Sequence, residues 1–169
     1  LMSGHGPDVE SWRKASEAEL AAWWSDLASG DARRAGTAEI SFLRTPVQAV
    51  ATATALPVSV KMRRGVANGS RTCLEVGPRL VEAGAASLTL HPRSAKQMYT
   101  GTADHSLTAE LVELVDVPVI ASGDVSSRAR AQSVLATTGA AAVMVGRAAQ
   151  GNPWVLREIM GDEREPSRE

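Results

Sequence analysis

The sequence contains little cysteine and few aromatic residues. Cys73 is the only cysteine, which excludes a disulfide within the chain and fits the reducing conditions of the cytoplasm. Aromatic residues make up 4% of the 169 positions, and three of the four tryptophans lie before residue 25, where they predict helix packing rather than ligand binding. No apolar run is long enough for a membrane span, and no signal peptide is recognisable. We therefore expect a cytoplasmic protein.

An excess of charge of one sign is also lacking. The 18 basic and 19 acidic residues leave a formal net charge of −1, which argues against nucleic-acid binding through bulk charge. Hydrophobic residues account for 44% and charged residues for 22%, values that are ordinary for a globular protein. The length suffices for one domain with a sizeable core.

The first part of the chain, residues 1–45, predicts one amphipathic helix. Ser16 to Glu19 resembles a capping box, Gly30 would end the helix that follows, and a short strand is possible at residues 40–43. A second helix is expected from Pro46, which suits a first helical turn, to about Ala53. We expect three regions: this N-terminal segment, a region at residues 46–157, and an acidic tail at residues 158–169.

From residue 56 onward, strands and helices alternate. Four short β-rich runs are separated by helical patterns, and their positions are 58–62, 86–90, 117–121 and 141–145. The helical patterns cover residues 73–83, where Gly77-Pro78 predicts a short or kinked helix, and residues 126–138, ended by Gly139. A third has Leu107, Leu111, Val112 and Leu114 on one face. The pattern predicts βα units and a buried parallel sheet.

Four such units amount to half of a (β/α)₈ barrel, which usually takes about 250 residues. The predicted fold class is α/β, a partial TIM barrel with an N-terminal helical segment, and a small open α/β sheet is the alternative. Because βα crossovers are right-handed, we expect the four strands to be parallel neighbours in chain order, with their helices outside. Half a barrel leaves two exposed edges, so we expect the N-terminal segment or a partner chain to cover one of them.

Each of the four runs ends in polar or glycine-rich sequence. In chain order the runs lead to Lys61 and Arg63; to His91 and Arg93; to Ser122, Gly123 and Asp124; and to Gly146 and Arg147. In a parallel α/β fold these ends lie side by side on one face, which is where barrel enzymes have their active sites.

The last two strand ends suit a phosphate group. Gly123 and Gly146 allow backbone N–H groups to approach an anion closely, and Arg147 can supply a charge-assisted contact. Either motif alone is as well explained by a tight turn. Because they lie one βα unit apart, together they favour phosphate binding.

Lys61 and His91 each allow two interpretations. Lys61 is either a rim lysine that reaches water or a cation facing a ligand ring that becomes anionic. A lone histidine is usually a core residue with satisfied hydrogen bonds. His91, however, lies at a strand end beside Arg93, which favours a site.

Four segments resemble the tRNA-dihydrouridine synthase family in order and spacing. They read PVSVKMRRG, AGAASLTLHPRSAKQMYTGTAD, VPVIASGD and TGAAAVMVGRAAQGNPW, and the resemblance runs from about Pro46 to Trp154. It implies the second half of an FMN-binding TIM barrel in an oxidoreductase that acts on tRNA, with a reduced nicotinamide cofactor as electron donor. By the same resemblance, Lys61 and His91 contact the flavin ring. The resemblance also implies that the phosphate end of FMN is bound by Ser122, Gly123, Asp124, Gly146 and Arg147. The substrate cleft would be lined by Arg93, Gln97 and Tyr99.

The resemblance has gaps. In that family reduced flavin delivers hydride to uridine, and a cysteine in an Asn-x-Gly-Cys-Pro context donates the proton. This motif is absent here, and Cys73 is interpreted as a packing residue, so no catalytic acid is assigned. Ser122 replaces a common asparagine, and His105 stands where tryptophan is usual.

Three hypotheses follow. The first is an FMN-dependent tRNA-dihydrouridine synthase in truncated or aberrant form. The second is a non-catalytic half-barrel that binds phosphate or flavin, or that pairs with another chain. The third is a barrel of the dihydroorotate dehydrogenase type, against which the loop at Gln97 to Tyr99 argues.

Overall fold

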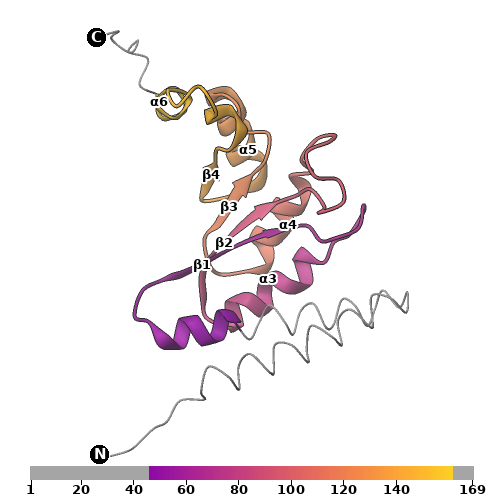
Figure 1. Cartoon of the computed structure of the whole chain (residues 1–169), viewed down its shortest axis with the longest axis vertical. Coiled ribbons are helices and arrows are strands. Elements are labelled where there is room, and N and C mark those ends of the chain that lie inside the picture. Colours follow the sequence, from indigo (N-terminus) through magenta and orange to yellow (C-terminus); the bar gives the residue numbers. More distant parts are fainter. Residues whose placement is uncertain (1–45, 162–169) are drawn as a thin grey trace, which may run out of the picture.

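The computed structural model describes residues 46–161, in which strands and helices alternate along the chain (Figure 1). Residues 46–53 are helical, as expected from Pro46. The elements that follow are β1 (Val58–Arg63), α3 (Cys73–Glu82), β2 (Ala85–His91), α4 (Ser106–Leu114), β3 (Val119–Ser122), α5 (Arg128–Thr138), β4 (Ala142–Met144), the 3₁₀ helix η1 (Arg147–Ala149) and α6 (Val155–Met160). The capping box and the short strand predicted before residue 45 lie outside the described residues.

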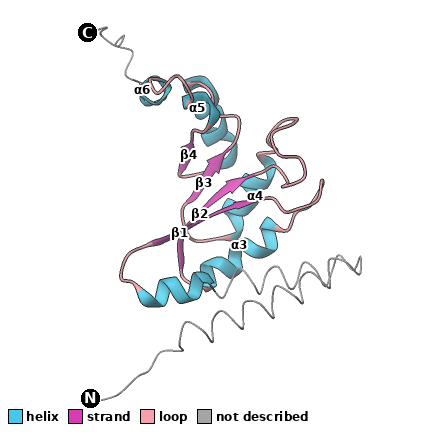
Figure 2. Cartoon of the chain, in the orientation of Figure 1, coloured by secondary structure: helices cyan, strands magenta, loops and turns pink. Residues whose placement is uncertain are grey.

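The four strands form one parallel sheet in the order β1-β2-β3-β4. Helix α3, α4 or α5 lies between each strand and the next, and Figure 2 shows these helices along one side of the strands. A doubly wound sheet would reverse its strand order and place helices on both faces. Since right-handed crossovers in unbroken order place every helix on the same face, the arrangement is that of a partial barrel. Both the parallel order and the fold class are confirmed.

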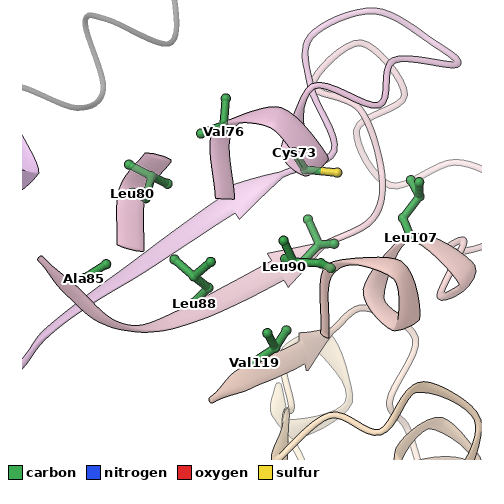
Figure 3. Packing of buried hydrophobic residues seen from close by; sticks show 9 residues of the cluster. Cys73, Val76, Leu80, Ala85, Leu88, Leu90, Leu107 and Val119 are labelled. Carbon is green, nitrogen blue, oxygen red and sulfur yellow. The ribbon is translucent and has the colours of Figure 1, made fainter. Parts of the chain in front are cut away.

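The main core lies between the sheet and its helices. Leu88 and Leu90 of β2 are fully buried against side chains of α3 and α4 (Figure 3). Leu107 and Leu111 of α4 are buried as their spacing predicts, whereas Leu114, at the end of that helix, is 52% exposed. The apolar stripe of α4 is therefore shorter than the sequence pattern suggested.

Helix α3 runs without interruption through Gly77 and Pro78. The reason for Gly77 is close packing: a Cβ atom there would lie 2.5 Å from Cδ1 of Leu111 on α4. The glycine thus permits a close approach of α3 and α4, where the sequence had suggested a short or kinked helix.

Helix α5 ends at Gly139, as the sequence predicts, and begins after Ser127. The side chain of Ser127 accepts a hydrogen bond from the N–H of Arg130, and Gly139 adopts the left-handed conformation with φ 68°. At the other end of the chain, α6 extends beyond residue 157, so the boundary predicted there falls inside a helix. Within residues 46–161, no helix has the length and apolar character needed to cross a membrane.

The strand register places the predicted strand-end residues on the sheet face opposite the helices. Lys61 pairs with Thr89, Arg63 pairs with His91, and Ser122 pairs with Met144. Because side chains alternate along a strand, these positions share the face that the interior of a complete barrel would enclose.

Candidate functional site

A cavity of about 630 Å³ opens at the carboxyl ends of the strands. Strands β1, β2, β3 and β4, or the loops that follow them, all contribute to its walls. Its lining consists of Lys61, Arg63, His91, Tyr99, Ser122, Gly123, Asp124, Val125, Ser126, Met144, Val145, Gly146, Arg147, Ala148 and Gln150. The strand ends singled out from sequence are thus brought together in one concave site.

Lys61 and His91 both line this cavity. Lys61 is exposed at the end of β1, whereas His91 is 8% exposed. Burial, and to a smaller extent the nearby cations Arg63, Lys61 and Arg93, lower the pKa of His91 to about 4. The imidazole is therefore neutral at pH 7, and Lys61 carries the positive charge of the pair.

The turn after β3 has an unusual backbone. Gly123 and Asp124 have φ values of 112° and 54°, so both lie in the region that favours glycine. A Cβ atom on Gly123 would lie 2.9 Å from Cδ2 of His91 and 3.0 Å from the Cβ of Ala103. Glycine is needed here because the turn packs directly on His91.

His105 stabilises the same turn through a hydrogen bond to its backbone. Its Nε2 lies 2.9 Å from the carbonyl oxygen of Gly123, and since a carbonyl only accepts, Nε2 carries the proton. Burial lowers the pKa of His105, against the opposing effect of this hydrogen bond. No local signal in the sequence indicated this role, because the two residues are 18 positions apart.

Asp124 connects three loops. Its Oδ2 accepts hydrogen bonds from Nη2 of Arg93 and from the N–H of Ala103, both at 2.7 Å, and its Oδ1 accepts one from Nη2 of Arg147 at 3.1 Å. Burial raises the pKa of Asp124, but the hydrogen bonds from Ala103 and Arg93 and the charges of Arg93 and Arg147 outweigh this and lower it below its usual value. The carboxylate is therefore ionised at neutral pH.

The loop after His91 is held by arginines. Nη1 of Arg63 donates hydrogen bonds to the carbonyl oxygens of Ser94 and Met98, each at 3.0 Å. Tyr99 extends from this loop to the cavity, and the guanidinium carbons of Arg63 and Arg147 lie 5.7 and 5.2 Å from its ring centroid.

Arg93 and Gln97 are not among the residues that line the cavity. Arg93 is 1% exposed and donates to the carbonyl oxygens of Thr100 and Gly101 as well as to Asp124. The amide of Gln97 donates to the carbonyl of Thr100 within the same loop. Their assignment to a substrate cleft stays a prediction, and in this structure both stabilise the loop that carries Tyr99.

Gly146 and Arg147, which follow β4, form another part of the cavity wall. A Cβ atom on Gly146 would meet no heavy atom within 4 Å, so this side of the backbone faces open space. Arg147 is about half exposed and directs one guanidinium nitrogen to Asp124. The other nitrogens can contact a ligand.

Cys73 does not line the large cavity. It is buried in the main core, and desolvation raises the pKa of its thiol to about 11 (Figure 3). It borders a smaller cavity of about 230 Å³, which Lys61 also borders and His91 does not. Cys73 thus shares a cavity with Lys61 but not with His91.

The charges of the large cavity favour an anionic ligand. Lys61, Arg63 and Arg147 face it against a single carboxylate, that of Asp124. Such an excess of cations in a concave site attracts phosphate groups. Residues 46–161 contain no group of three or more histidine, cysteine or acidic side chains placed to hold a metal ion.

The family profile and the relatives found by sequence agree on one family. The profile of the family described as "Dihydrouridine synthase (Dus)" matches residues 38–168. The chain is 41% identical to tRNA-dihydrouridine synthase B of Pseudomonas syringae pv. tomato over 113 residues, which cover 67% of the chain and 34% of that relative. It is 32% identical to the protein of the same name from Pectobacterium carotovorum over 167 residues, covering 94% of the chain and 52% of the relative.

The chain thus spans between about a third and about half of the length of these two relatives. Among solved structures, a nitroalkane oxidase from Streptomyces ansochromogenes matches 66% of the chain at 22% identity, covering 37% of that structure's chain, with a TM-score of 0.35. A TM-score this low does not establish a shared fold.

Proposed function

Because the chain belongs to the dihydrouridine synthase family, we propose that its cavity binds FMN in an enzyme that reduces uridine to dihydrouridine in tRNA. A reduced nicotinamide cofactor would supply the electrons. The observation that carries the proposal is the cavity at the carboxyl ends of all four strands, in which a cationic, glycine-containing wall lies together with Lys61 and His91.

The residues present fit a phosphorylated flavin. Gly146 leaves open space beside the backbone, Arg147 is half exposed, and Ser122 places a hydroxyl at the end of β3, so this wall suits the phosphate end. Lys61 and His91 lie on the strands β1 and β2, further along the cavity, and suit the ring.

When bound, FMN in its reduced form would supply a hydride to the uracil ring. Around it, the Lys61 ammonium would stabilise negative charge on the ring, and His91, being neutral, would contribute a hydrogen bond without a charge. Tyr99, at the rim between Arg63 and Arg147, would bound the space available to a nucleotide.

Cofactor binding is tested by titrating FMN with the purified chain and measuring the quenching of flavin fluorescence. We expect saturable binding, and we expect Lys61→Ala to weaken it by about tenfold or more, the scale of one hydrogen bond to a charged group. Lys96→Ala is the matched control, because Lys96 is exposed and does not line the cavity. Failure of the unsubstituted chain to bind FMN, or equal losses in both variants, would contradict the proposal.

One observation favours a second function for this chain by itself, that of a non-catalytic flavin- or phosphate-binding half-barrel. Its only cysteine is buried with a raised pKa and is absent from the cavity that contains His91. In the described residues, β1 and β4 each pair on one side only, so another chain that adds a strand could complete the sheet. Binding of FMN without reduction of tRNA would support this second function.

A further inference from the structure

Asp124 is the one acidic residue among those that line the cavity, although its charge has the wrong sign for an anion site. One of its oxygens accepts hydrogen bonds from Arg93 and Ala103, and the other accepts one from Arg147. These partners come from the loops after β2 and β4, while Asp124 follows β3. The carboxylate therefore joins three of the four strand ends.

The local structure is built around this carboxylate. Asp124 adopts φ 54°, a conformation that few residues other than glycine adopt, and the preceding Gly123 packs against His91 and Ala103. Arg93 is 1% exposed, and beyond Asp124 it donates only to Thr100 and Gly101 carbonyls and approaches His91. A buried guanidinium of this kind requires a carboxylate partner, and this requirement explains why one oxygen of Asp124 is bound to Arg93.

The other oxygen has a different effect. Arg147 is about half exposed, and an unpaired arginine at such a position would sample many rotamers. Its hydrogen bond to Asp124 and its contact with the Tyr99 ring restrict it to the wall of the cavity. Part of the entropy cost of binding an anion is thereby removed in advance.

We propose that Asp124 is a positioning residue that orients Arg147 toward the phosphate of the flavin nucleotide and ties the Tyr99 loop to the same turn. The proposal rests on FMN binding as set out above. It opposes a simple electrostatic expectation, in which removal of a negative charge strengthens anion binding. For two unit charges about 4 Å apart in bulk water, that repulsion amounts to about fivefold in affinity.

The test compares FMN with riboflavin, which lacks the phosphate. Dissociation constants are measured by flavin fluorescence for the unsubstituted chain, Asp124→Asn, Arg147→Ala and the double variant. We expect Asp124→Asn to weaken FMN by about tenfold, the scale of a charge-assisted contact, and riboflavin by less than about twofold. In the Arg147→Ala background, Asp124→Asn should have no further effect on FMN.

Asp116→Asn is the matched control, since it removes the same charge from an exposed residue before β3, at the opposite end of the sheet. If Asp124→Asn does not fold by circular dichroism, Arg93→Met/Asp124→Asn takes its place, because it removes the buried charge together with its partner. Unchanged or tighter FMN binding in the Asp124 variant would overturn the positioning role alone. Equal losses for FMN and riboflavin would also overturn it. If the unsubstituted chain binds neither flavin, the proposed function fails as well.

Discussion

At the scale of single residues, His91 couples the stability of the fold to pH. Its pKa is about 4 in the folded chain and near its usual value of 6.5 in the unfolded chain. Between these two values the unfolded state binds more protons, so the free energy of unfolding falls as the pH falls from about 6.5 to about 4. Above pH 6.5 the contribution of His91 is fully present, and below pH 4 no more of it is lost.

We predict that His91→Gln shows a weaker loss of stability between pH 7 and pH 4.5 than the unsubstituted chain. Urea unfolding at several pH values measures this. His105, whose pKa is also lowered, remains in both proteins, so the difference between the two curves isolates His91. Parallel curves over this range would show that His91 does not titrate as described.

At the scale of elements, the contact between α3 and α4 depends on one missing methyl group. A Cβ atom on Gly77 would lie 2.5 Å from Cδ1 of Leu111, which is fully buried. Overpacking of this kind costs about 1–3 kcal/mol, whereas replacing glycine by alanine inside a helix gains about 1 kcal/mol. The steric cost is therefore expected to equal or exceed the gain.

We predict that Gly77→Ala lowers the free energy of unfolding by up to about 2 kcal/mol in the unsubstituted chain. In a Leu111→Ala background, where the clashing methyl is absent, the same substitution should instead stabilise by about 1 kcal/mol. Chemical denaturation of the unsubstituted chain, the two single variants and the double variant measures the four free energies of unfolding that this double-mutant cycle needs. An equal effect of Gly77→Ala in both backgrounds would refute the packing explanation.

At the scale of the whole molecule, four βα units form a cavity of about 630 Å³ whose lining residues include no cysteine, whereas the proposed reaction needs an acid that protonates a uracil carbon. General acids typically contribute about 10²–10⁴-fold to such a step. Cys73 cannot substitute, since its thiol is buried in the helix-side core with a pKa of about 11. The cavity and the only thiol of the chain are thus separate.

We therefore predict that reduced FMN bound to the chain is oxidised by tRNA at least about 100-fold more slowly than reduced FMN bound to a full-length relative. Single-turnover flavin absorbance, with the Pseudomonas syringae relative as the reference, measures the two rates. Cys73→Ser is expected to leave the rate of the chain unchanged. A rate equal to that of the relative would show that another residue acts as the acid.

The sequence by itself determined the alternation of strands and helices and the grouping of functional residues at strand ends. These features follow from local periodicity and from the rule that parallel strands end on one face, so Lys61, His91, Gly123, Gly146 and Arg147 were placed at one site. The helix-end signal at Gly139 is local in the same sense.

Only the tertiary structure decided between a partial barrel and another open sheet, because strand order is a relation among distant segments. It also showed that Arg93 is buried and pairs with Asp124, which lies 31 positions away. The reasons for Gly77 and His105 emerged in the same way, from packing on Leu111 and from a hydrogen bond to Gly123. Contacts between residues far apart in sequence have no local pattern, and such contacts set which polar groups face a ligand and which hold the fold.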